Sequence, residues 1–142
     1  MPYRRLDADQ AFWRPSNQMG VMNTDLGKQL EAQSLGARLW RLEPGQASTR
    51  HRHRTQEELY VVLEGAGRMR VDDDLLTLRR LDAVLVSADC VRQIFNDSDI
   101  THLWLVVGAP REAANTLELT EELLRFIYPD GPQALPPDLS AP

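Results

Sequence analysis

Apolar residues in the middle of the chain fall into short runs separated by turn-forming residues. In several runs, apolar and polar residues alternate with a period of two, as they do in β-strands that bury one face. Turns rich in glycine or aspartate lie between them, for example at residues 64–67 and 72–74. Together with the segment 45–54, the runs predict about eight short strands, which is typical of an all-β sandwich or barrel. The runs are residues 35–42, 57–63, 68–71, 75–78, 81–86, 93–96 and 100–107.

The two ends of the chain differ from this strand-rich middle. Residues 1–34 contain scattered proline and glycine, so we expect an irregular N-terminal arm whose Phe12 and Trp13 dock on the core. Residues 111–142 hold a short helix and a proline-rich tail that we expect to be extended or disordered. The chain therefore divides into an N-terminal arm (1–34), a β-barrel (35–110), and a C-terminal helix with its tail (111–142).

The sequence marks both ends of the C-terminal helix. Thr120 is a good N-cap residue, and two glutamates follow it in the first turn, where the helix dipole favours negative charge. Leu119 and Leu124 occupy the two positions of a hydrophobic staple. The apolar stripe ends before Pro129, which limits the predicted helix to two turns, and its residues are Leu123, Leu124 and Ile127.

Composition limits the function classes that remain open. The chain has 142 residues, 42% of them hydrophobic, and no apolar run approaches the roughly 20 residues needed to span a bilayer. The formal net charge of −5 argues against a general nucleic-acid binder, since phosphate contacts need a basic surface. Cys90 is the only cysteine, so no intrachain disulfide can form. The first residues lack the apolar stretch of a signal peptide, and we expect a soluble, cytoplasmic protein.

Two of the three histidines, His51 and His53, lie between the first two apolar runs. On an extended strand their imidazoles project from one face. Glu58 follows five residues after His53, and if the run 59–63 folds back antiparallel on the histidine strand, its carboxylate converges on the same volume. Two imidazoles and a carboxylate form a candidate site for a divalent transition metal such as Fe, Mn, Ni or Zn.

The spacing around these histidines resembles the first sequence motif of the cupin superfamily. That motif reads glycine, five residues, His-x-His, four residues, Glu, six residues and glycine. It is matched by Gly45, His51, His53, Glu58 and Gly65. The resemblance implies a double-stranded β-helix, the jelly-roll cupin barrel, over about residues 35–110.

The second cupin motif is degenerate. Aligned on Asn96, the chain has Arg92 in the position where the family carries its fourth metal ligand, a histidine. A guanidinium has no lone pair for a metal but pairs well with carboxylates and phosphates. Two outcomes stay open. Either the histidines and Glu58 hold a metal while Arg92 binds the anionic part of a substrate, or Arg92 pairs with Glu58 and the barrel holds no metal.

Other residues of the predicted barrel are candidates for weaker roles. Four aromatic residues could line a ligand pocket or belong to the core: Trp40, Tyr60, Phe95 and Trp104. His102 is the remaining candidate for a fourth ligand, although a lone histidine on a strand is more often structural. The arginines that alternate with the histidines face the other way and indicate a solvated or subunit-contact face; they are Arg50, Arg52 and Arg54.

These features leave two classes of function open. One is a small metal-dependent enzyme of oxygenase, isomerase or lyase type that acts on a small anionic molecule. The alternative is a non-catalytic small-molecule-binding or assembly module without a metal, in which Arg92 fills the vacated ligand position. The resemblance also implies a homodimer, with the arm around Phe12 and Trp13 crossing to the neighbouring subunit.

Overall fold

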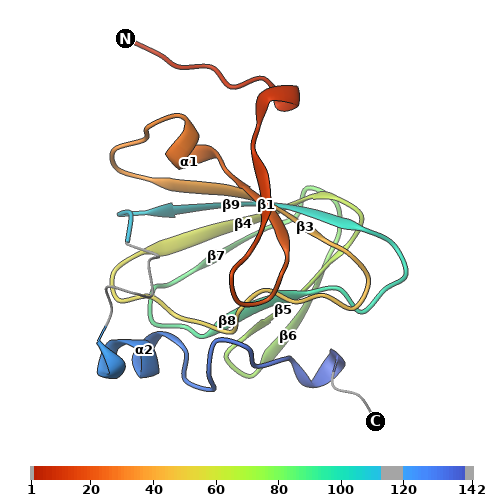
Figure 1. Ribbon diagram of the computed structural model, residues 1–142. Helices are drawn as coiled ribbons and strands as arrows, with labels where there is room; N and C mark the ends of the chain where they lie inside the picture. Colours follow the sequence, from red (N-terminus) through yellow and green to blue (C-terminus); the bar gives the residue numbers. More distant parts are fainter. Residues whose placement is uncertain (1, 113–119, 140–142) are drawn as a thin grey trace.

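A computed structural model describes residues 2–112 and 120–139 of the chain (Figure 1). The described strands form two antiparallel sheets, which confirms the predicted all-β class. The larger sheet contains, in spatial order, β1 (Trp13–Pro15), β2 (Met22–Asp25), β3 (Gly36–Leu42), β9 (His102–Ala109), β4 (Glu57–Glu64) and β7 (Ala83–Val86). The smaller sheet contains β6 (Asp74–Leu78), β5 (Gly67–Val71) and β8 (Arg92–Phe95).

The core lies between the two sheets. Strand β4 shows the period-two pattern clearly, because Tyr60 and Val62 are buried while Leu59 is 38% exposed. Buried side chains of the smaller sheet, such as Met69 and Ile94, pack in the same cluster. The alternation read from the sequence therefore marks the inward and outward faces of the barrel.

The N-terminal arm is more regular than we expected. It contains β1, β2, the short helix α1 (Leu26–Gln29) and the 3-10 turn η1 (Ala8–Gln10), and β2 pairs along β3. The hydrophobic pattern could not predict β2, since its two buried residues, Asn23 and Thr24, are polar. The docking of Phe12 was also wrong, because that side chain is 67% exposed, whereas Trp13 lies under the Arg41 guanidinium at 4.3 Å.

The C-terminal helix α2 (Glu121–Ile127) begins where the sequence predicted. The Thr120 hydroxyl accepts a hydrogen bond from the Leu123 backbone N–H at 3.2 Å, which confirms the N-cap. The predicted staple cannot be judged, because Leu119 lies outside the described residues.

The described part of the tail is docked on the barrel, contrary to our expectation. The segment runs along the lower edge of the barrel in Figure 1 and ends in the 3-10 turn η3 (Pro137–Leu139). The Arg70 guanidinium contacts both carboxylate oxygens of Asp138, at 3.0 and 3.2 Å, and the Gln93 side chain donates to the Ala134 carbonyl at 2.9 Å. Proline-rich composition was a poor guide here, because single polar contacts fix the segment.

Two of the alternating arginines hold this C-terminal segment. The Arg52 guanidinium lies 4.0 Å from the centre of the Phe126 ring, and its Nε donates to the Phe126 carbonyl at 2.6 Å. Arg50 pairs with Asp130 at 2.6 Å, while Arg54 is exposed. The interpretation of a solvated or subunit-contact face was therefore wrong for Arg50 and Arg52.

The described helices are all short. None of them has the length and apolar character that crossing a bilayer would require.

Two glycines at strand starts provide a matched test of the packing between the sheets. A Cβ at Gly67 would lie 2.5 Å from both the Trp104 ring and Val62, whereas a Cβ at Gly36 would meet nothing within 4 Å. Because the Gly67 site has no free volume, we expect Gly67→Ala to lower the free energy of unfolding by about 1–3 kcal/mol. Gly36→Ala should leave it unchanged or slightly higher. Equal effects of the two variants in urea unfolding would contradict this packing.

Candidate metal centre

The histidine segment and Glu58 come from opposite sheets. His51 exchanges two backbone hydrogen bonds with Arg92 of β8, at 3.0 and 2.8 Å, so the segment lies along the smaller sheet. Strand β4 pairs with β7 and β9 of the larger sheet, and the expected antiparallel fold-back onto the histidine segment was therefore wrong. Residues 54–56 carry the chain from one sheet to the other, so Glu58 meets the histidines across the barrel interior.

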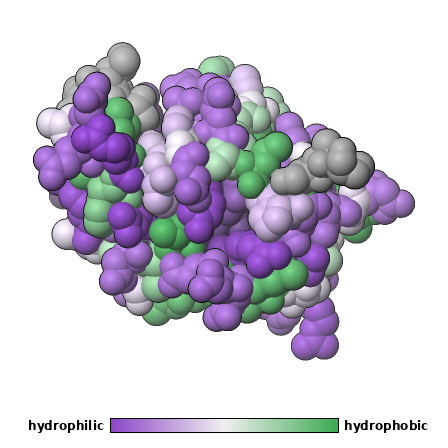
Figure 2. All heavy atoms as spheres, turned by 90° about the horizontal axis from the view of Figure 1, so that it is seen from below, coloured by the Kyte–Doolittle hydropathy of each residue, from purple (hydrophilic) through white to green (hydrophobic). Residues whose placement is uncertain are grey.

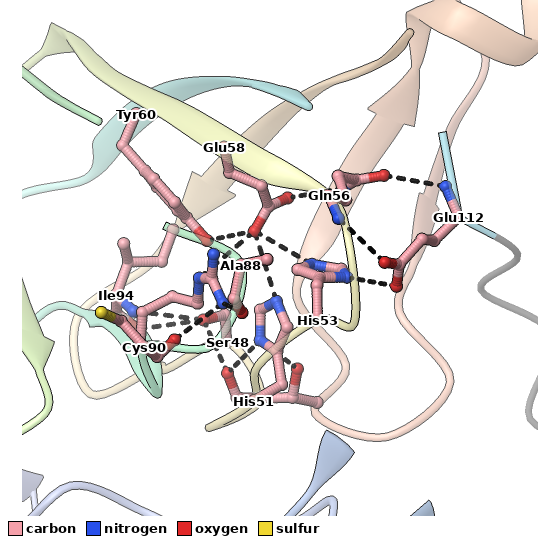
Figure 3. Close-up of polar contacts among 12 residues, drawn as sticks. Ser48, His51, His53, Gln56, Glu58, Tyr60, Ala88, Cys90, Ile94 and Glu112 are labelled. Carbon is pink, nitrogen blue, oxygen red and sulfur yellow. Dashed lines mark hydrogen bonds and ion pairs between the residues drawn. The ribbon is translucent and has the colours of Figure 1, made fainter. Parts of the chain in front are cut away.

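The three predicted ligands converge on one point. The Nε2 atoms of His51 and His53 lie 3.5 and 3.1 Å from Oε1 of Glu58. One ligand atom from each residue fits within a group in which all separations are at most 4.8 Å. Figure 3 shows both imidazoles pointing at the Glu58 carboxylate, with Tyr60 approaching from another side. The structure thus brings together the set read from sequence spacing.

Hydrogen bonds on the far side of each ring fix which nitrogen faces the site. Nδ1 of His51 lies 3.1 Å from the Thr49 carbonyl, and Nδ1 of His53 lies 3.2 Å from Oε2 of Glu112. Both partners can accept a hydrogen bond from Nδ1, and the tautomer with its proton on Nδ1 satisfies them and directs the Nε2 lone pair of each ring at the site. Nε2 of His53 is buried without a hydrogen bond. Two lone pairs and a carboxylate oxygen facing one another fit a bound cation, and the donor set suits Fe, Mn, Ni or Zn.

The carboxylate of Glu58 is buried and held on both oxygens. Oε1 accepts from the Tyr60 hydroxyl at 2.8 Å, and Oε2 accepts from the Gln56 amide at 3.2 Å. Burial alone would raise the pKa of Glu58, but when no cation is bound the hydrogen bonds and electrostatic attraction from His51 and His53 outweigh burial and hold that pKa well below its usual range. The carboxylate is therefore ionised and fixed in orientation, as a metal ligand must be.

Glu112 belongs to the site and was missed. It follows β9 and lies 59 positions from His53 in the chain, so spacing carried no signal for it. Its carboxylate accepts from the backbone N–H groups of residues 54–56 and from the Thr55 hydroxyl. Burial would raise the pKa of Glu112, but these hydrogen bonds lower it to about 2. An ionised Glu112 thus orients the His53 ring and holds in place residues 54–56, which connect the two sheets.

Arg92 lies in the barrel interior and holds the loop before β8 in place. Its side chain is fully buried, and its two terminal nitrogens donate to three backbone carbonyls of the loop before β8. Its Nε lies 3.5 Å from Oε1 of Glu58. Arg92 is not among the residues that line the cavity beside the metal centre. The expected contact with a substrate anion therefore finds no support, and the expected pairing with Glu58 is present. The carbonyls belong to Ser87, Ala88 and Cys90.

The other sequence candidates fall into two groups, residues that line the cavity and residues that belong to the core. Tyr60 lines the cavity; burial and then the Glu58 charge raise its pKa well above the usual value. Trp40 also lines the cavity. Phe95 and Trp104 are fully buried, and neither lines the described cavity, which favours the core interpretation for both. His102 lies six residues along β9 from Gly108, the partner of Glu58, which places it about 20 Å from the site and excludes it as a fourth ligand.

A cavity of about 330 Å³ opens beside the converging ligands. Its walls combine the metal centre with aromatic, apolar and charged residues of the larger sheet, and with Ile127 and Tyr128 at the end of α2. Figure 2 views the molecule from the side where the C-terminal segment lies; hydrophilic residues cover most of this face, and apolar residues form separate patches. The volume suits a small molecule.

Comparison with known proteins identifies a family and a fold. The family model described as the cupin domain matches residues 38–108. No curated protein matches the chain at a significant level.

Among solved structures, a sugar phosphate isomerase of the cupin superfamily from Silicibacter pomeroyi is similar at 30% identity, with 76% of each chain covered and a TM-score of 0.69. A predicted oxalate decarboxylase from Thermotoga maritima is similar at 16% identity, covering 76% of this chain and 100% of the other, with a TM-score of 0.68. KdgF from a Halomonas species is similar at 17% identity, covering 77% and 96%, with a TM-score of 0.65. The last two likenesses concern the fold alone.

Because Arg92 holds the loop before β8, we predict a large loss of stability when its side chain is removed. Arg92→Ala leaves the three loop carbonyls without their donors and removes the nearest cation from the buried Glu58 carboxylate. We expect the free energy of unfolding to fall by about 3–5 kcal/mol. Arg92→Lys keeps the charge but loses the fork of donors, so its loss should be smaller. Arg79→Ala is the control, since that side chain is 92% exposed. Equal stability of wild type and Arg92→Ala in denaturant titrations would contradict this stabilising role of Arg92.

Proposed function

The chain belongs to the cupin family, and we propose that it is a divalent-metal-dependent isomerase acting on a small anionic substrate in the barrel cavity. The observation that carries the metal dependence is the convergence of His51, His53 and Glu58 at the cavity wall, with the buried Nε2 of His53 lacking any hydrogen bond. Three protein ligands leave coordination positions open toward the cavity.

Different residues of the site would hold the ion and keep its ligands oriented during such a reaction. A divalent ion held by the three ligands would polarise a substrate carbonyl oxygen and so make the neighbouring C–H bond more acidic. Glu112 and the Thr49 carbonyl keep the two rings oriented, while Tyr60 and Gln56 keep the Glu58 carboxylate in place.

The choice of isomerisation rests on one relative. The Silicibacter pomeroyi structure is called a sugar phosphate isomerase, and 30% identity over 76% of both chains supports carrying a reaction class to this chain as a proposal. The oxalate decarboxylase name comes with 16% identity and therefore supports only the fold. We accordingly favour isomerase over oxygenase or lyase chemistry.

One observation favours a second candidate, a non-catalytic binding module without a metal. Nε of Arg92 lies 3.5 Å from Oε1 of Glu58, and a guanidinium this close to a ligand oxygen repels a divalent cation. In this case the same cavity would bind its small molecule without chemistry. Metal content separates the two candidates, because only the first requires an ion.

Metal binding and its dependence on Glu112 provide the test. We expect the untagged protein to bind one Zn²⁺ or Mn²⁺ per chain by isothermal titration calorimetry, and Glu58→Gln to abolish this binding. Glu112→Gln removes the charge that orients His53, so the affinity should fall about 10- to 100-fold. Glu57→Gln is the matched control, since Glu57 is exposed on the outer face of the same strand.

The outcomes of this experiment distinguish the candidates. Absence of metal binding, with intact folding by circular dichroism, would sink the metal-dependent enzyme and leave the binding module. If metal binds, the loaded protein is incubated with aldose and ketose phosphates, and their interconversion is followed by ¹³C nuclear magnetic resonance. Metal binding without any interconversion would contradict the isomerase assignment alone.

We propose that the protein is a homodimer formed through the outer face of the larger sheet. Leu59 and Leu85 face each other across β4 and β7 on that side and are 38% and 63% exposed. A sheet that is apolar on both faces is normally covered on both, and a second copy offers the matching surface. Further apolar residues alternate outward on the neighbouring strands, namely Leu39, Val61, Leu105 and Val107.

A charge placed in this face should dissociate the dimer. Leu85→Glu buries a carboxylate against the second copy, so we expect a monomer in sedimentation equilibrium where the wild type is a dimer. Ile100→Glu is the control, because Ile100 is 53% exposed but lies in the turn before β9, away from the sheet face. A monomeric wild type would overturn the proposal.

A further inference from the structure

A second cluster of charged residues lines the same cavity on β1, β2 and β3. Arg14 pairs in register with Asn23, and Asp25 pairs with Arg38. All four residues line the cavity together with Trp40, which also pairs with Asn23. Apart from Trp40, the sequence did not single out these positions, because two of the three strands lie in the arm that was expected to be irregular.

The two arginines differ in how their charge is compensated. Arg38 contacts Asp25 at 3.0 Å and donates to the Asn23 amide oxygen at 2.8 Å, so its guanidinium is fixed and nearly neutralised. Among the described residues, the guanidinium of Arg14 contacts only the neutral Asn17 side chain, at 2.7 Å. On these three strands the cavity wall has two arginines against one carboxylate, Asp25, so this part of the wall carries an excess of positive charge.

Hydrogen-bond donors accompany this charge. The Ser16 hydroxyl oxygen accepts from the Val21 backbone at 3.0 Å, which leaves the hydroxyl proton for another partner. Ser16 and Asn17 both line the cavity next to Arg14. Arginine forks combined with hydroxyl donors are the chemistry that binds phosphate oxygens.

The distance from this wall to the metal centre sets the length of a ligand that reaches both. Val106 of β9 pairs with Arg38 on one side and with Tyr60 on the other. Two strand spacings therefore separate the backbones of Arg38 and Tyr60, about 10 Å. Between the two groups the floor is formed by Val106 and Gly108, which are small and leave room for a chain of atoms.

We propose that Arg14 and Arg38 form a phosphate subsite that holds the anionic end of an elongated, phosphorylated substrate whose other end reaches His51, His53 and Glu58. This inference rests on the proposed function for the reaction at the metal centre, and it adds the substrate class and its orientation. It also explains how an anion binds although Arg92 is buried away from the cavity.

Inorganic phosphate tests the subsite independently of the metal. Binding to protein stripped of metal by a chelator is measured by isothermal titration calorimetry, so that phosphate cannot ligate an ion. We expect Arg14→Gln to weaken phosphate binding about tenfold through loss of a charge-assisted pair. Arg14→Lys should recover part of it, and the exposed Arg79→Gln should have no effect.

A variant that should bind phosphate more tightly provides a second test. Asp25→Asn removes the carboxylate paired with Arg38 but keeps an oxygen to cap α1, where Asp25 now accepts from the Lys28 backbone at 2.9 Å. The uncompensated Arg38 should then bind phosphate several-fold more tightly. Zn²⁺ affinity should be unchanged in both the Arg14 and Asp25 variants, since neither residue belongs to the metal centre.

The outcomes distinguish failure of the phosphate subsite from failure of the proposed function. Equal phosphate affinity in wild type and Arg14→Gln, or no phosphate binding by a wild type that binds Zn²⁺, would overturn the subsite and leave the proposed metal centre standing. Phosphate binding that depends on Arg14 in a protein that binds no metal would support the subsite while the isomerase proposal fails. Succinate binding as tight as phosphate would overturn the phosphate assignment.

Discussion

The buried negative charge of Glu58 is the constraint on which the rest of the site depends. An isolated carboxylate in a barrel interior is costly unless charge and hydrogen bonds compensate it. Here compensation comes from both sheets: the histidine segment and Arg92 approach from the smaller sheet, and Tyr60 and Gln56 belong to the larger one or to its approach. The burial of Glu58 therefore depends on contacts from both sheets, so loss of either set of partners should affect stability and site geometry together.

Arg92 shows how a family position can change chemistry without losing its structural purpose. A histidine there would donate one lone pair to a metal, whereas the guanidinium supplies permanent positive charge and satisfies three loop carbonyls. The arginine lowers the cost of burying Glu58 even when no cation is bound, and it weakens the attraction for a divalent ion by like-charge repulsion. A metal held by the remaining three ligands would be bound less tightly than one with four protein ligands and would keep more positions open.

Sequence patterns predicted the parts of the molecule that depend on local periodicity or fixed spacing. Short apolar runs between turn residues located β3 to β9, and the spacing of His51, His53 and Glu58 located the candidate metal centre. What failed was what depends on contacts between distant segments. Strand β2 buries polar residues, the C-terminal tail is held by single ion pairs, and Glu112 reaches His53 only because the end of β9 lies beside the crossover. No periodicity records such pairings, and the direction of the Arg92 side chain was likewise decided by carbonyls that the sequence does not reveal.

The cavity is asymmetric, and this asymmetry restricts the chemistry more than the fold does. Electron-rich candidate ligands for a cation gather at one end, and excess guanidinium charge gathers at the other, on strands that lie two to four spacings from β4. A ligand that satisfies both ends must carry its anion far from the atoms that would react at the metal centre. Binding energy from that remote anion can then position the reacting end without contacting it. Compact substrates whose only charge lies at the reacting group would leave the arginine wall unused, which is why the geometry favours an elongated substrate with a terminal anion.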